Sequence, residues 1–232
     1  MSDLNARTRV KVCGITRAQD LEAAAEAGVD AIERVKEELR TAMFLVGALG
    51  VADLRHVTLA KAVELALRLP AFMAPVGLFV NASPADVDAA VREIPQLLLQ
   101  FHGDETAADC GRHRRPFLRA ARIAAGFDLL DFAAQFADAQ ALLLDAHVEG
   151  FGGGGKVFDW SLIPANVHRH LVLSGGLHAG NVVEGILRVR PWAVDVSSGV
   201  ESAKGIKDAA AIRSFCQAVR EADARSAETS IR

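Results

Sequence analysis

The sequence predicts an α/β protein folded as a (β/α)8 barrel of the TIM-barrel class, in one domain spanning residues 1–232. Short apolar runs typical of buried strands alternate with amphipathic segments typical of helices, at spacings of about 20–30 residues. Such alternation produces right-handed βαβ units and a parallel sheet. Glycine or small polar residues follow several of the apolar runs, at the end of the strands where a barrel carries its reaction site.

Composition agrees with one large α/β core and limits the classes of partner. The chain has 232 residues, of which 51% are hydrophobic, and its net charge is −3. No clustered basic face of the kind that binds nucleic acid is evident. Three widely spaced cysteines suggest neither a disulfide framework nor a metal site. The start, MSDLNARTR, carries no export signal, and no apolar run is long enough to span a bilayer. A cytoplasmic protein without membrane or nucleic-acid partners is expected.

The elements are predicted in chain order from the spacing of apolar residues and from turn and capping signals. A strand at 9–12 is followed by a helix that ends at Gly28. A helix at 59–69 stops at Pro70, and from residue 76 the alternation becomes regular. Further strands are predicted at 76–80, 97–101, 117–123, 141–145, 171–173 and 192–196, and helices at 84–94, 105–111, 129–136, 181–189 and 208–222. Residues 220–232 are expected to form a frayed tail.

The region of the second strand departs from this plan. Between Glu33 and Val46 apolar residues recur at helical spacing with charged residues between them, which predicts a helix. The second strand would then be replaced or perturbed by a helical insert at about 33–54, and the unpaired edges of its neighbours could support self-association. A competing interpretation places the second strand at Met43–Leu49, after a helical insertion.

Two strand ends carry side chains suited to proton transfer. Asp145 closes the apolar run 141–144, and four consecutive glycines follow at 152–155. Because carboxylates are rarely buried unpaired, this aspartate needs a partner or a chemical task. Cys13 follows the first strand directly before Gly14. It is either a small buried apolar residue or a general base, which would require a lowered pKa.

Two later strand ends predict an anion site. Ser-Gly-Gly at 174–176 and Ser-Ser-Gly at 197–199 follow the seventh and eighth strands, where barrels often bind phosphate. Glycines let backbone N–H groups point into a concave nest, although a single glycine pair also makes ordinary turns. The candidate phosphate-binding residues are Gly175, Gly176, Ser198 and Gly199. Gln100 and His102 at the end of the fourth strand, and Asp195 in the eighth, are candidates for substrate contact or for structural roles.

Six motifs together resemble the phosphoribosylanthranilate isomerase family of tryptophan biosynthesis. They are KVCGIT (11–16), GLFVNAS (77–83), LLLQFHGDE (97–105), LLLDAHVEGFGGGGKVFDW (142–160), LVLSGGLHAGNV (171–182) and VDVSSGVESAKGIKD (194–208). The likeness covers residues 9–32 and 55–219. It implies a (β/α)8 barrel and a cofactor-free Amadori rearrangement of N-(5-phosphoribosyl)anthranilate to 1-(2-carboxyphenylamino)-1-deoxyribulose 5-phosphate, with no metal and a phosphorylated small molecule as the partner.

The resemblance also implies roles for individual residues. Asp145 would be the general acid that opens the furanose ring, and Cys13 the general base that removes the C2′ proton of the resulting Schiff base. The glycine loops after the seventh and eighth strands would bind the phosphate. Arg55 would hold the anthranilate carboxylate.

The segment Glu33–Leu54 does not follow the family pattern. Its part LRTAMFLVGALGVADLR (39–55) resembles a helix of FMN-dependent barrels such as type 2 isopentenyl diphosphate isomerase. An engineered graft at this position is the simplest explanation. The alternative hypothesis is therefore a chimeric barrel scaffold with little or no catalytic activity, and a flavin enzyme, which would be yellow, is a third.

Overall fold

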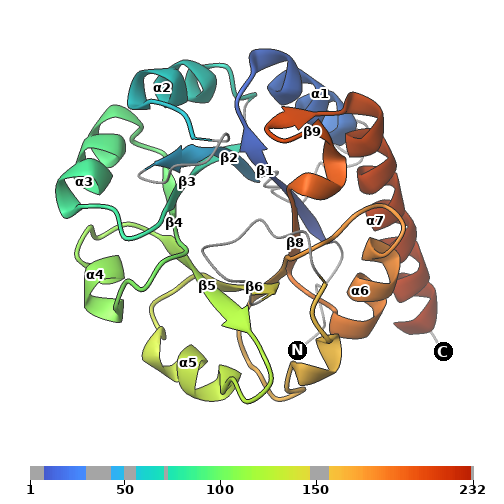
Figure 1. Ribbon diagram of the computed structural model, residues 1–232. Helices are drawn as coiled ribbons and strands as arrows, with labels where there is room; N and C mark the ends of the chain where they lie inside the picture. Colours follow the sequence, from blue (N-terminus) through green and yellow to red (C-terminus); the bar gives the residue numbers. More distant parts are fainter. Residues whose placement is uncertain (1–7, 30–42, 50–55, 71–72, 147–156, 231–232) are drawn as a thin grey trace.

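Eight parallel strands form a closed barrel in chain order, and β8 pairs with β1 to complete the ring (Figure 1). The computed structural model describes residues 8–29, 43–49, 56–70, 73–146 and 157–230. The strands are β1 (Arg9–Ile15), β2 (Met43–Leu49), β3 (Ala74–Phe79), β4 (Leu98–Phe101), β5 (Phe117–Ile123), β6 (Ala141–Ala146), β7 (Leu171–Leu173) and β8 (Ala193–Val196). The barrel fold predicted from the alternation is confirmed.

Helices surround the ring of strands. They are α1 (Ala18–Val29), α2 (Leu59–Leu67), α3 (Pro84–Glu93), α4 (Ala107–Gly111), α5 (Leu129–Gln135), α6 (Val182–Val189) and α7 (Ala209–Ser230). Two short 3-10 turns, η1 (Trp160–Leu162) and η2 (Ser198–Val200), and a small hairpin of β9 (Glu201–Ala203) with β10 (Ile206–Lys207) complete the described elements. Side-chain caps begin several helices: Ser83 accepts a hydrogen bond from the Asp86 N–H at the start of α3.

The second strand is present in the barrel. Met43–Leu49 pairs in parallel with β1, where Lys11 lies opposite Met43, and with β3, where Leu45 lies opposite Val76. The helix predicted from Glu33 to Val46 is therefore wrong at residues 43–46, while residues 33–42 and 50–54 lie outside the described residues. The competing interpretation is confirmed for the strand Met43–Leu49, whereas the helical insertion that it places before this strand lies outside the described residues. An uninterrupted apolar run of this length suits a strand covered on both faces.

This pairing also removes the expected open edge. Because β2 bonds to both neighbours, every described strand of the barrel has a partner on each side. The described strands therefore leave no open edge through which the barrel could self-associate.

Residues 220–230 are helical and this part of α7 is tied to the barrel, so the predicted frayed tail is wrong over these residues. The Arg220 guanidinium donates to the carbonyl of Ala27 at the end of α1 (3.2 Å). The Asp223 carboxylate accepts from the Thr8 backbone N–H (3.1 Å) and from its hydroxyl (2.7 Å). These contacts hold α7 at residues 220–223 against α1 and the start of β1, which the composition of the segment did not show.

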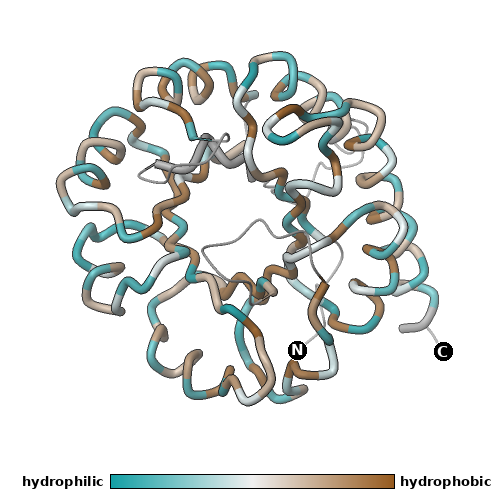
Figure 2. Tube along the Cα trace, in the orientation of Figure 1, coloured by the Kyte–Doolittle hydropathy of each residue, from teal (hydrophilic) through white to brown (hydrophobic). Residues whose placement is uncertain are grey.

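Two apolar layers position the reaction site. Hydrophobic residues follow the ring of strands, and hydrophilic residues the outer parts of the helices (Figure 2). The inner layer fills the barrel and consists of Val76, Leu118, Ala120, Ala141, Leu143, Val172 and Ala193, with Cys13 packed against it. The outer layer lies between strands and helices and contains most of the other buried apolar residues. Side chains along a strand point alternately into and out of the barrel, so the residue two positions after an inward residue also points inward.

Candidate active site

On six strands, β1, β4, β5, β6, β7 and β8, the inward positions nearest the carboxyl end are polar and lie above an apolar layer. Successive side chains of a strand point alternately into and out of the barrel, and this alternation identifies the inward positions. The inward residues at this end are Lys11, Cys13, Gln100, His102, Arg122, Asp145, Ser174 and Asp195. Six of these were predicted as site or phosphate-loop positions, whereas Lys11 and Arg122 were not. The fold therefore gathers candidates from β1, β4, β6, β7 and β8 at one face.

Lys11 is a completely buried cation at the closure of the barrel. Its Nζ lies 2.8 Å from Asp195 Oδ1, and the hydroxyl of Ser174 donates to Asp195 Oδ2 (3.3 Å). Burial alone would lower the pKa of Lys11, but the charges of Asp195, Cys13 and Asp145 and the Asp195 hydrogen bond outweigh it and raise this pKa above its ordinary value of 10.5. Lys11 is thus a fixed positive charge within electrostatic reach of both predicted catalytic groups.

Lys11 could have been recognised in the sequence. A lysine inside a short apolar strand, two residues before Cys13, must share the inward face with the thiol. Its partner could not be recognised, because Asp195 is 184 residues away and meets it only when β1 and β8 pair.

Asp145 and His102 are neighbours across the barrel mouth. The Oδ2 atom of Asp145 lies 3.3 Å from Nε2 of His102, and both residues are buried. The other carboxylate oxygen accepts from the Ala146 N–H (2.9 Å). His102 Nδ1 lies 3.4 Å from Nε2 of Gln100. The buried carboxylate has the polar partner that its position required.

Two buried polar atoms beside Asp145 have no hydrogen-bond partner among the described residues. They are Nε2 of His102, whose contact with Asp145 has the distance but not the angles of a hydrogen bond, and Oε1 of Gln100. Unpaired buried polar atoms are uncommon in native proteins and call for an explanation. A polar substrate at this face would supply the missing partners.

The glycine loops after β7 and β8 lie against each other. Gly175 and Gly176 have positive φ angles of 82° and 63°, which favour glycine. Within the described ranges, the backbone N–H groups of Gly175, Gly176, Ser198 and Gly199 donate no hydrogen bond. A Cβ atom on Gly199 would lie 1.9 Å from the carbonyl oxygen of Leu177, so the two loops touch there. Four donors on two adjoining loops suit an oxyanion such as phosphate.

Replacing Gly199 with alanine should therefore disturb both loops. Because the clash is with backbone, we expect a loss of about 1–3 kcal/mol in unfolding free energy and a raised KM for a phosphorylated substrate. Thermal denaturation and initial-rate kinetics measure the two effects. Gly111→Ala is the matched control, since a Cβ atom there meets nothing within 4 Å. Equal KM values for the two variants would argue against a phosphate contact at the Gly199 loop.

The remaining candidates are placed as follows. Arg55 and the glycine run 152–155 lie outside the described residues. Asp159 caps η1 by accepting from the Ser161 N–H (2.9 Å). Cys110 on α4 is buried, which raises the pKa of its thiol to about 12.

Where the structure describes the chain, no three His, Cys, Asp or Glu side chains group as a metal site. None of the described helices is long and apolar enough to cross a bilayer.

Comparison with known proteins gives consistent matches over nearly the whole chain. Residues 10–218 match the family model described as N-(5'phosphoribosyl)anthranilate (PRA) isomerase. Proteins named N-(5'-phosphoribosyl)anthranilate isomerase from Leptothrix cholodnii and Methylibium petroleiphilum are each 62% identical over 225 residues, or 97% of this chain and 96% and 100% of theirs.

Solved structures agree with these sequence matches. The phosphoribosyl anthranilate isomerase of Thermotoga maritima superposes with a TM-score of 0.78 at 33% identity, covering 92% of this chain and 99% of that one. A phosphoribosyl anthranilate isomerase in complex with reduced 1-(o-carboxyphenylamino)-1-deoxyribulose 5-phosphate superposes with a TM-score of 0.75 at 32% identity and the same coverage.

Proposed function

Because the chain belongs to the N-(5'-phosphoribosyl)anthranilate isomerase family and is an isomerase of tryptophan biosynthesis, we propose that Cys13 and Asp145 catalyse its reaction at the carboxyl-terminal face of the barrel. The substrate is N-(5'-phosphoribosyl)anthranilate, and the product is the corresponding 1-deoxyribulose phosphate. Both side chains point inward at strand ends of β1 and β6. The observation that carries the proposal is that both side chains share this inward face with Lys11, which is completely buried and paired with Asp195.

The rearrangement needs one proton given and one proton taken. Asp145 donates a proton to the furanose ring oxygen, and the C1′–O bond breaks as the anilino nitrogen forms a Schiff base at C1′. Cys13 then removes the proton from C2′, and the electron pair moves to give the enolamine. Tautomerisation to the ketone completes the product. Each positioned acid or base typically contributes about 10²–10⁴-fold. These steps are proton transfers, so they require neither metal nor cofactor.

Lys11 assists the base in this proposal. Its positive charge favours the thiolate form of Cys13, since the interaction between two charged groups acts on both equally. The ion pair with Asp195 fixes the ammonium group and prevents it from moving to the substrate. A buried, immobile cation next to a thiol is one of the environments that make cysteines reactive.

Substrate binding uses the other polar groups of this face. The adjoining loops of Gly175–Gly176 and Ser198–Gly199 offer backbone donors to the phosphate, and Gln100 and His102 offer their unpaired buried atoms to the ribose or the anilino group. The related structure holding a reduced product analogue supports a phosphorylated small-molecule ligand. Recognition of the anthranilate carboxylate by Arg55 stays a prediction, as does a cytoplasmic location.

The comparisons do not favour the chimeric scaffold hypothesis. Relatives at 62% identity cover 97% of the chain. The segment at 33–54 does not remove the second strand, so the barrel around the site is closed.

Turnover of freshly prepared phosphoribosylanthranilate, followed by loss of its fluorescence, tests the proposal. We expect decay by the parent protein and a rate lower by about 10²–10⁴-fold for Cys13→Ala. Cys216→Ala is the matched control, because Cys216 is a buried thiol on α7. If the parent protein turned the substrate over no faster than buffer does, the isomerase function would be rejected. If Cys13→Ala turned it over as fast as the parent protein, the role of Cys13 as the base would be rejected.

A further inference from the structure

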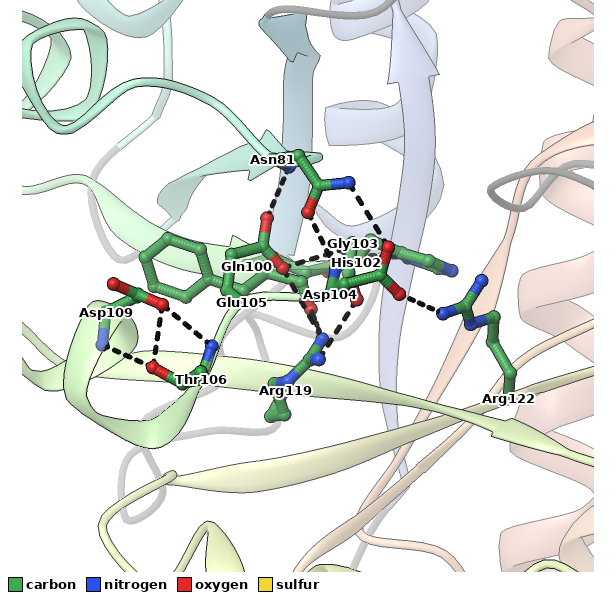
Figure 3. A network of polar contacts seen from close by, with 11 residues as sticks. Asn81, Gln100, His102, Gly103, Asp104, Glu105, Thr106, Asp109, Arg119 and Arg122 are labelled. Carbon is green, nitrogen blue, oxygen red and sulfur yellow. Dashed lines mark hydrogen bonds and ion pairs between the residues drawn. The ribbon is translucent and has the colours of Figure 1, made fainter.

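Arg119 holds the backbone on both sides of His102. It lies on β5 and points outward, away from the barrel interior, with its guanidinium 4.8 Å from the ring of Phe136. One terminal nitrogen donates to the carbonyl of Phe101 and the other to that of Gly103, each at 3.0 Å (Figure 3). A guanidinium fork can span two carbonyls in this way, whereas the single ammonium of lysine cannot.

Glu105 secures the same segment from the other side. Its Oε2 atom accepts from the Gly103 N–H (2.9 Å) and lies 3.7 Å from Nη1 of Arg119. Its Oε1 atom accepts from the backbone N–H of Asn81 (2.6 Å), just beyond β3 (Figure 3). The side chains of Glu105 and Arg119 are only 8% and 6% exposed. One buried pair therefore joins the carboxyl ends of β3 and β4 to β5.

The segment held in this way has little freedom to move. The backbone N–H of His102 donates to the carbonyl of Phe79 (2.9 Å). A Cβ atom on Gly103 would lie 2.4 Å from Oδ1 of Asn81 and 2.7 Å from its backbone nitrogen. Asn81 itself has a left-handed φ of 51°. The chain thus packs as closely at His102 as its backbone permits.

Stability alone does not account for this arrangement. Burial lowers the pKa of Arg119, an effect that the Glu105 carboxylate opposes. Taking two charges out of water costs free energy that their attraction often fails to recover, and apolar residues of similar size frequently stabilise a protein as well. What such a pair does supply is a fixed geometry for the groups it bonds to.

We propose that Glu105 and Arg119 are positioning residues, which hold the imidazole of His102 against the proton-donating carboxyl group of Asp145. The inference rests on the proposed function of Asp145. His102 Nε2 and Asp145 Oδ2 are 3.3 Å apart, and the two buried charges contact the residues flanking His102 rather than the inward face. They act on the reaction only through the place they give to His102.

The expected consequence is kinetic. A misplacement of about 1 Å in a catalytic group can reduce the rate about 100-fold. Arg119→Lys keeps the charge but loses the fork, and Glu105→Gln keeps the shape but loses the charge. Both should lower kcat by about 10–100-fold and raise KM by less than that factor, because His102 supplies only one of the proposed substrate contacts and the phosphate loops are untouched. The pH dependence of kcat should shift as well, since His102 adjoins the acid.

Arg169→Lys is the matched control. Arg169 also donates to backbone carbonyls, those of Phe136, Ala137 and Ala139, but it precedes β7 at the other end of the barrel. It should lose stability in the manner of Arg119→Lys while keeping the parent's kcat per folded molecule and its pH profile. Denaturation curves for all variants separate loss of fold from loss of rate.

A double-mutant cycle with His102→Gln decides whether the pair acts through the imidazole. Arg119→Lys and Glu105→Gln should have almost no further effect on kcat in the His102→Gln background. Additive losses in that background, or unchanged kcat and pH profiles in the folded single variants, would overturn the inference. If Arg119→Lys does not fold, the double-mutant cycle can be completed with Glu105→Gln and His102→Gln. An inactive parent would instead overturn the proposed function itself, so the two failures are distinguishable.

Discussion

Replacing Asp145 with asparagine is expected to lower kcat by about 10²–10⁴-fold without unfolding the protein. Asparagine has the shape of aspartate and can still accept the hydrogen bond that Asp145 Oδ1 receives from the Ala146 N–H. Its amide cannot transfer a proton to the ring oxygen. Ring opening would then have to use water, and the loss should fall on kcat rather than KM.

Steady-state kinetics with freshly prepared substrate measure this loss, and circular dichroism checks the fold. Asp159→Asn is the matched control, because the exposed Asp159 caps η1, where asparagine caps equally well, and its ion pair with Arg188 is long (3.9 Å) and solvent-exposed. Its activity should equal that of the parent. A similar kcat for Asp145→Asn and Asp159→Asn would show that Asp145 is not the acid.

Replacing Lys11 with methionine should produce the largest loss of stability. The ammonium is 0% exposed and lies 2.8 Å from Asp195, so its removal leaves a buried carboxylate whose one other hydrogen-bond partner, within the part of the chain that the structure describes, is Ser174. Breaking a buried pair from one side typically costs about 3–5 kcal/mol. We also expect slower alkylation of Cys13, because the thiolate loses the charge that favours it.

Chemical denaturation measures the stability, and Lys61→Met is the matched control. Lys61 and Glu64 are also 2.8 Å apart but are largely exposed, so this variant should unfold like the parent. The pKa of Lys11 is raised in the folded state, so its contribution should be complete below pH 10.5 and be lost only as the pH rises through the folded-state pKa. Equal denaturation midpoints for the two variants would contradict the argument.

The sequence was sufficient for most of the barrel because strand and helix signals there agree. Phe117–Ile123 and Leu171–Leu173 occur with the predicted bounds. The preferred interpretation missed the strand Met43–Leu49. It predicted a helix there because the helical spacing of apolar and charged residues upstream continues into this segment. Local periodicity cannot tell a buried strand from a buried helix in a run of this length.

The candidate site was predictable only to the level of single strand ends. Asp145 was recognisable as a buried carboxylate, but its neighbour His102 comes from β4, and no spacing in the sequence relates the two. The Arg119–Glu105 pair was missed for a similar reason. An arginine in the apolar strand Phe117–Ile123 is unusual, but the carbonyls that justify it belong to the end of a different strand.

The pairing of β1 with β8 has a consequence for synthesis of the protein. Lys11 and Cys13 leave the ribosome about 180 residues before Asp195, so the ring cannot close until β8 has been synthesised. At an elongation rate of about 5–20 residues per second, the edge of β1 that pairs with β8 lacks its hydrogen-bonding partner for roughly 10 s or longer. Activity should therefore appear abruptly with release of the finished polypeptide, and nascent chains that stop before β8 are expected to depend on chaperones.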